Sequence, residues 1–394
     1  MQKLLHRLSR LALIGLVFPV QFCLAQVPLQ ENVYFAGPAF ISNYADIPQR
    51  FPLVSQAIGF GAGSASGEFE ALLRNEVRTI KPRAFQIANK DEAVTGDYKK
   101  GTGKAVSFAF SHESVEVQEM DDKFVTVYDI AAQVLFFDYS PEARRLLASY
   151  PVRLRYTDLT TARPTIEQQR ATVKARLFDT QQQTSLIKHW LRRLETAEPK
   201  GGDRLVNVKQ VEFDPKAAGQ IPADVSREML SVEIAQMLES TISEEWQVPM
   251  VPVTVGEAIK GKMVQVLSNG DSAEFDLPPP SHVVRTLVRD FRKVSEPING
   301  GERVAYGVFI TSSIVGAAGP LSELKIKNVE SITRPKIIKV QLNDWAQFRN
   351  TLASLLVKAT QQVLASDRAW IAENSATPSA KQQLDLIKSR VLGR

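Results

Sequence analysis

The sequence of 394 residues has a single cysteine and only four histidines. A lone cysteine excludes an internal disulfide, so burial of the core has to stabilise the fold. The histidines stand far apart, whereas a zinc site needs several histidine, cysteine or carboxylate ligands that converge. We therefore expect no metal site.

Long apolar runs are also missing. The most apolar stretch, residues 11–20, is well short of the roughly 20 residues that a membrane-spanning helix needs. It follows Lys3, Arg7 and Arg10 and precedes Ala25, an order of basic, apolar and small residues typical of a secretory signal peptide. This pattern predicts a protein that is periplasmic or secreted.

We expect the signal peptide, residues 1–25, to be cleaved between Ala25 and Gln26, which removes the only cysteine, Cys23. Two alternatives stay open. Residues 1–25 could remain as an N-terminal anchor or a buried first helix, or the protein could be a lipoprotein modified at Cys23. Phe22 argues against lipidation, because such a site normally has a small residue directly before the cysteine.

The charge balance of the mature chain is nearly even. Cleavage removes three of the 48 lysines and arginines and none of the 43 acidic residues, which lowers the formal net charge from +5 to about +2. A nucleic-acid partner therefore loses its main electrostatic support. Hydrophobic residues make up 44% and charged residues 23% of the sequence, which is typical of an ordinary globular protein.

The mature chain is long for one hydrophobic core and suits two domains. Pro199 and the glycines that follow it form a natural boundary. We expect a first domain over residues 26–199, a second over residues 200–366, and a polar or helical tail over residues 367–394.

Hydrophobic periodicity predicts the elements of the first domain. We expect strands, a hairpin turning at residues 119–123, a short helical piece, and amphipathic helices. The expected strands cover residues 33–40 and 152–156, and the hairpin covers 105–136. The helical piece covers 144–147, and the amphipathic helices cover 68–80 and 181–197.

The second domain repeats this order. We expect a strand, a long helix, a hairpin turning at residues 299–301, a strand and a final helix, over 205–213, 223–246, 283–314, 324–332 and 345–364. The fold class is therefore α+β or α/β, with two tandem strand-helix-hairpin-strand-helix domains and mixed sheets. We favour a domain duplication, and coincidence is the alternative.

This order of elements resembles the exported α/β domain of the TolB amino-terminal region, which the curli secretion channel and the penicillin-binding-protein activator lipoproteins share in outline. The resemblance covers each half as a pattern of elements. It implies a binding or structural role in an assembly of the cell envelope, and it carries over no functional residue.

Glycines are concentrated at residues 59–67, where Gly59, Gly61 and Gly63 precede an expected helix. Glycines let backbone N–H groups approach an anion at a helix N-terminus. A dinucleotide site, however, also needs a clear strand before the glycines and an acidic residue about 20 positions later. We interpret the segment as a flexible loop and predict no cofactor.

The second half has a long insertion, residues 248–280, which ends in three prolines. A proline run holds its end extended, so we expect Phe275, Leu277 and Pro279 to be available for contact. The halves differ most in this insertion and in the glycine-rich loop, and surface loops readily acquire specific contacts. We predict that these two loops bind a partner; simple connectors are the alternative.

The sequence holds no recognisable catalytic motif, and its acidic pairs are adjacent rather than opposed. We predict a non-enzymatic binding or assembly module of the cell envelope, whose partner is an envelope protein or a second copy of the chain. The alternative is an exported hydrolase or small-ligand-binding protein with a site between the domains. An enzyme would show titratable groups with shifted pKa values there, and an assembly module an exposed apolar patch or strand edge.

Overall fold

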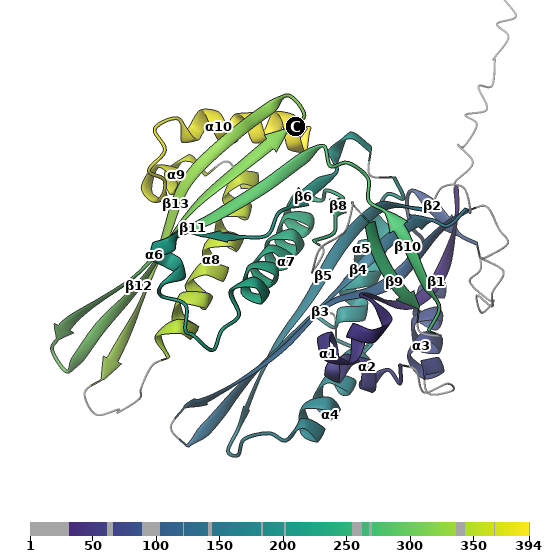
Figure 1. Cartoon of the computed structure of the whole chain (residues 1–394), viewed down its shortest axis with the longest axis horizontal. Coiled ribbons are helices and arrows are strands. Elements are labelled where there is room, and N and C mark those ends of the chain that lie inside the picture. Colours follow the sequence, from purple (N-terminus) through teal and green to yellow (C-terminus); the bar gives the residue numbers. More distant parts are fainter. Residues whose placement is uncertain are drawn as a thin grey trace, which may run out of the picture. The chain divides into compact units, whose positions relative to one another are not determined.

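The computed structural model describes residues 31–60, 66–88, 103–120, 122–140, 144–182, 184–200, 202–253, 262–267, 270–335, 343–365 and 367–393. The predicted signal peptide lies outside them. Among the described residues, no helix is long and apolar enough to cross a membrane. Helices and one large mixed sheet build the fold (Figure 1), which confirms the predicted α+β class.

The first half of the chain forms an antiparallel meander of three long strands. β3 (Lys104–Met120), β4 (Lys123–Asp138) and β5 (Arg145–Thr160) pair in that order, and β1 (Glu31–Ile41) lies parallel to β3. The other elements of this half are η1 (Tyr44–Asp46), α1 (Ile47–Arg50), α2 (Pro52–Ala57), α3 (Ser66–Thr79), β2 (Phe85–Ile87), α4 (Ile166–Leu177) and α5 (Leu186–Thr196).

The second half contains a similar meander. β11 (His282–Ile298), β12 (Gly301–Gly316) and β13 (Gly319–Pro335) pair antiparallel, and β6 (Val206–Val208) lies parallel to β11. The other elements are β7 (Glu212–Phe213), α6 (Pro215–Ala218), α7 (Arg227–Trp246), β8 (Met250–Val251), β9 (Lys262–Leu267), β10 (Ser272–Asp276), α8 (Asp344–Ala365), α9 (Arg368–Asn374), α10 (Ala380–Ile387) and a π-helical segment, Lys388–Leu392.

Both halves thus place one strand parallel to the first strand of a meander. β8 pairs antiparallel with β5 and parallel with β6, which joins the two meanders into one sheet. The chain from Glu31 to Arg394 forms one compact unit. The shared element order is consistent with a duplication, which stays a prediction that superposition of the two halves would test.

One hairpin from the second half joins the sheet of the first half. β9 pairs antiparallel with β1, β10 pairs with β9, and Asp276 at the end of β10 pairs with Arg145 of β5. The strand order β10-β9-β1-β3-β4-β5 therefore closes on itself at that bridge. The expectation of an irregular insertion over residues 248–280 is corrected here, because the segment contains β8, β9 and β10.

Helices cover one face of the first meander. Trp190 of α5 is fully buried there, with its ring centroid 5.3 Å from that of Phe108, and its Nε1 donates to the carbonyl oxygen of Gln133 at 3.0 Å. Helix α5 begins after Ser185, whose hydroxyl accepts the N–H of Lys188, as expected of an N-cap.

The β9–β10 hairpin packs on the opposite face of this meander. That face carries small residues such as Ala105 and Ala109, and the hairpin contributes Met263 and Phe275 to the same buried cluster. Strand side chains alternate between faces, so the long strands of this half are buried on both sides where the hairpin covers them, and partly exposed beyond it.

The core of the second half forms between its meander, α7 and α8. The C-terminal tail belongs to this core, because Leu384, Ile387 and Val391 are each no more than 1% exposed. The tail is therefore helical and packed.

Candidate functional site

The residues predicted to bind a partner have different surroundings. Gly59 follows α2 with a φ of 69°, and Gly61 and Gly63 lie outside the described residues. Phe275 is 2% exposed, with its ring 4.7 Å from that of Phe137, so the expectation that it is presented for contact is corrected. Leu277 packs half-buried on the same cluster. Pro279 is exposed.

The structure brings the start of the glycine-rich loop close to the turn of the β9–β10 hairpin. The ring of Tyr44 lies 5.5 Å from that of Phe60, which follows Gly59. A Cβ built at Gly270, in the hairpin turn, would lie 3.6 Å from Tyr44. Tyr44 is 53% exposed. Binding of a partner by these loops stays a prediction.

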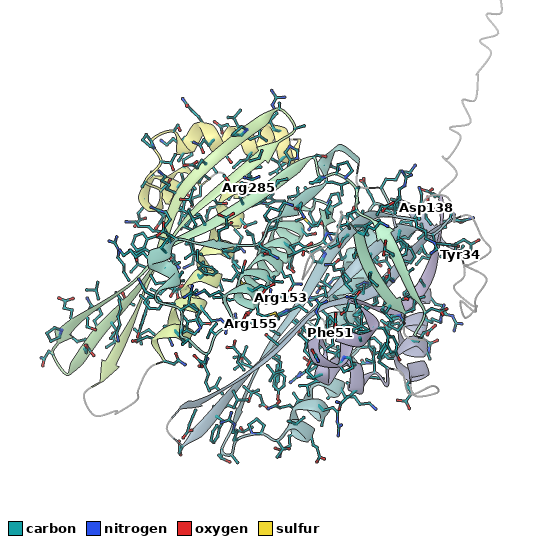
Figure 2. All side chains as sticks on the ribbon, in the orientation of Figure 1. Tyr34, Phe51, Asp138, Arg153, Arg155 and Arg285 are labelled. Carbon is teal, nitrogen blue, oxygen red and sulfur yellow. The ribbon has the colours of Figure 1, made fainter. Side chains whose placement is uncertain are left out.

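A different site appears between the first meander and two helices of the second half. It is a cavity of about 410 Å³, with β3, β4 and β5 on one side and α7 and α8 on the other. Figure 2 shows Arg153 and Arg155 on β5, where this strand passes α7. Arg349 of α8 also lines it. We call it the arginine cavity.

Strand alternation explains why polar side chains line its sheet side. Arg153, Arg155 and Thr157 face the cavity, while Leu154 and Tyr156 between them pack against the apolar core on the other face. Because side chains alternate with a period of two along neighbouring strands, this part of the meander has one polar face and one apolar face.

Two sets of ion pairs line the arginine cavity, one within the sheet and one that joins α8 to β3 and α7. Arg153 donates from Nε and Nη2 to the two carboxylate oxygens of Asp129, at 2.5 and 2.6 Å. Arg349 donates to Glu116 of β3 and to Glu233 of α7. A bidentate arginine–carboxylate pair fixes the direction of the guanidinium group, so these contacts hold the cavity's cations in place.

Arg153 and Arg155 differ in how their N–H groups are paired. Arg153 Nη1 is buried and has no hydrogen-bond partner among the described residues. Arg155 donates to the Asn350 side-chain oxygen at 3.2 Å, and within the described part of the chain it forms no ion pair. Arginine has five donors and no acceptor, so an acceptor-rich group would satisfy these donors.

Glu233 is a carboxyl group of the cavity with a shifted pKa. Burial raises its pKa to about 7, the charges of Arg153 and Arg155 oppose this rise, and the charge of Asp129 adds to it. This carboxyl therefore changes its protonation state near neutral pH, which alters the net charge of the cavity.

A neighbouring cavity of about 700 Å³ shares Ser114 and Glu233 with the arginine cavity. Glu113 in its wall accepts the N–H groups of Leu53 and Val54 at 2.8 and 2.9 Å. Burial raises the pKa of Glu113 to about 7, although these two hydrogen bonds lower it.

His112 in the same wall has the opposite shift. Burial, and then the charge of Arg153, lower its pKa to about 4, and its Nε2 has no hydrogen-bond partner among the described residues. The two cavities thus contain shifted titratable groups, the feature expected above of an enzyme, and burial is the largest cause of each shift. The described chain contains no group of three or more His, Cys, Asp or Glu side chains placed to hold a metal ion.

Sequence reasoning did not identify the arginine cavity. The alternation of basic and apolar residues from Arg153 to Tyr156 indicates a polar strand face, and this signal was available. The helices that cover that face come from the other half of the chain, so the cavity itself depends on tertiary structure.

Comparisons with known proteins leave the family open. No family model matches the chain, and no curated protein matches it either. Among solved structures, a minor lipoprotein from Acinetobacter baumannii is 11% identical, covering 44% of this chain and 97% of its own, with a TM-score of 0.21.

Two further solved structures are similar over one part of the chain. A hypothetical protein from Chlamydia trachomatis is 9% identical, covering 43% of this chain and 98% of its own, with a TM-score of 0.25. A neuraminyllactose-binding hemagglutinin homolog from Helicobacter pylori is 12% identical, covering 46% and 91%, with a TM-score of 0.26. These scores are too low to support an argument about function, and the resemblance to the TolB amino-terminal region stays a prediction.

Proposed function

We propose that the protein is exported and acts without catalysis, as a binding module of the cell envelope that holds an anionic group in the arginine cavity. The unpartnered Nη1 of Arg153 is the observation that carries this proposal. A buried donor without an acceptor costs about 1–3 kcal/mol, and a carboxylate or phosphate oxygen in the cavity would remove that cost.

Once Glu233 is protonated, the charges around the cavity support an anion rather than a neutral ligand, because Arg153, Arg155 and Arg349 then face two carboxylates. Asp129 neutralises Arg153, and Glu116 and Glu233 share Arg349. Arg155 contacts only an amide oxygen among the described residues. Protonation of Glu233 below its pKa of about 7 removes a negative charge, so the cavity becomes more positive as the pH falls.

Calorimetric titration of the mature protein with inorganic phosphate and with citrate tests the anion site. We expect saturable binding of at least one anion and none of glucose. The substitution Arg155→Met should weaken anion binding about tenfold. It removes one charge-assisted hydrogen bond, which contributes roughly 1.5 kcal/mol or more. Arg155 is exposed, so the variant should fold normally.

Arg285→Met is the matched control. Arg285 is exposed on β11, outside the residues that line the arginine cavity (Figure 2). The Arg285→Met variant should leave anion binding unchanged. Equal weakening by both substitutions would indicate unspecific attraction and contradict the proposal, as would the absence of binding by either anion.

A hydrolase is the second candidate function, because a carboxyl with a pKa near 7 suits a general acid or base. Glu233 would have that role. The two functions differ in what happens to a bound molecule: a binding module returns it intact, whereas a hydrolase returns its products.

The export part of the proposal has its own test. The intact mass of the protein purified after secretion should match a chain that starts at Gln26 and carries no lipid. Such a protein would lack Cys23. A mass that includes residues 1–25, or a diacylglyceryl group on Cys23, would overturn the assignment to a soluble mature protein.

A further inference from the structure

A second cavity, of about 160 Å³, lies beneath the β9–β10 hairpin, and we call it the hairpin cavity. Ala36 of β1, Ala105 of β3 and Ala273 of β10 are among its lining residues. These three side chains are small, so the facing strands leave a space that neighbouring side chains do not fill. The hairpin cavity shares no lining residue with the arginine cavity.

Aromatic rings form much of the wall of the hairpin cavity. Phe137 and Phe275 lie 4.7 Å apart, and Tyr34, labelled in Figure 2, meets Tyr139 edge-on at 6.4 Å. Aromatic rings prefer offset or edge-to-face contacts with other rings. Arg144 and Asp271 also line the cavity, so its wall suits a small planar molecule that is mostly apolar and carries one polar group.

One polar group in the wall is not satisfied. Gln265 of β9 is 1% exposed, and its Nε2 donates to the Ser107 hydroxyl at 2.9 Å. Its Oε1 is buried and has no partner within the described residues. Buried polar side-chain atoms normally have a partner, so this acceptor is free to take a hydrogen bond from a bound molecule.

We propose that the hairpin cavity binds a small aromatic molecule carrying one hydrogen-bond donor, as in a phenol, with the donor directed to Gln265 Oε1. The volume of the hairpin cavity agrees with a ligand of this size, because an apolar cavity of about 150 Å³ can hold benzene. The site is independent of the anion site proposed above, since a neutral aromatic ring needs no arginine.

Ligand-observed NMR titrations of the mature protein with phenol and with toluene test this inference. The two probes have similar shapes and differ in one hydroxyl group. We expect saturable binding of both, about tenfold tighter for phenol. Gln265→Leu should abolish the preference for phenol while toluene still binds. Ala36→Leu, which fills the cavity from β1, should abolish the binding of both probes.

Gln118→Leu is the matched control, because Gln118 lines the arginine cavity instead; it should leave both affinities unchanged. Thermal unfolding of each variant verifies that the fold is retained. The inference is overturned if neither probe binds, if the wild type does not prefer phenol, if Gln265→Leu keeps the preference, or if folded Ala36→Leu still binds phenol. A crystal structure with only water on Gln265 Oε1 in the presence of phenol would also overturn it.

Discussion

Replacing Phe275 by alanine should lower the free energy of unfolding by about 3–5 kcal/mol, the usual cost of removing a buried phenylalanine ring. Phe275 is 2% exposed and packs on Phe137 between the hairpin and the first meander. Equilibrium urea unfolding, followed by tryptophan fluorescence, measures the change.

Tyr44→Ala is the control for this substitution. It also removes an aromatic ring close to the hairpin, but Tyr44 is 53% exposed. Its effect should stay within about 1 kcal/mol. If Phe275→Ala were equally mild, the hairpin would not be an integral part of the first core.

Replacing Glu239 by glutamine should stabilise the protein at pH 9 and leave its stability nearly unchanged at pH 5. Glu239 of α7 is 1% exposed, and one of its oxygens accepts the N–H of Val253 at 3.3 Å. Burial raises its pKa from 4.5 to about 8. The folded state therefore keeps a proton on Glu239 at pH values where the unfolded chain has lost it.

The sign of the pH dependence follows from this difference. The stability contributed by protonated Glu239 is complete below about pH 4.5 and is lost as the pH rises through 8. At pH 9 the stabilisation by glutamine should be about 3–5 kcal/mol. Glu113 and Glu233 shift in the same direction, to about 7, so the variant should keep part of the wild-type dependence.

Thermal unfolding at pH 5, 7 and 9 measures this effect. Glu228→Gln, at an exposed position of the same helix, serves as the control and should change stability by no more than about 0.5 kcal/mol at each pH. If the melting temperature of Glu239→Gln equalled that of the wild type at pH 9, the raised pKa of Glu239 would be contradicted.

Local sequence patterns predicted those helices and strands in which apolar residues recur at a regular spacing. The apolar spacing of residues 68–80 corresponds to α3, and the long helices α7 and α8 also start and end within four residues of the expected positions. The turns of the two long hairpins lie where they were expected, between β3 and β4 and between β11 and β12. Each of these elements carries its signal in neighbouring residues.

Other elements were missed for identifiable reasons. Helix α4 buries only Val173 and Leu177, so its apolar pattern is weak, although Thr165 and Gln168 form a capping box that marks its start. The expected helical piece at residues 144–147 overlaps the start of β5, because Leu146 pairs with Phe137 on β4. At residues 144–147, pairing with β4 therefore outweighed the local helical preference of the sequence.

The candidate sites depended on contacts that no local pattern contains. Arg153 and Glu116 are ordinary charged residues of long strands in the sequence. They face a cavity because α7 and α8 cover that side of the meander. Likewise, Phe275 and Gln265 belong to short strands next to a proline run, and their burial requires pairing of β9 with β1.

The pairing of β9 with β1 also has a consequence for biosynthesis. β1 enters the chain early, but its partner β9 comes from the opposite half of the sequence. Contacts between residues so far apart in the sequence slow folding. The N-terminal half emerges first from the ribosome, and until β9 is made it has an unpaired strand edge and an uncovered apolar face. We expect the nascent chain to remain incompletely folded, with this edge and face open to aggregation, until the hairpin is synthesised.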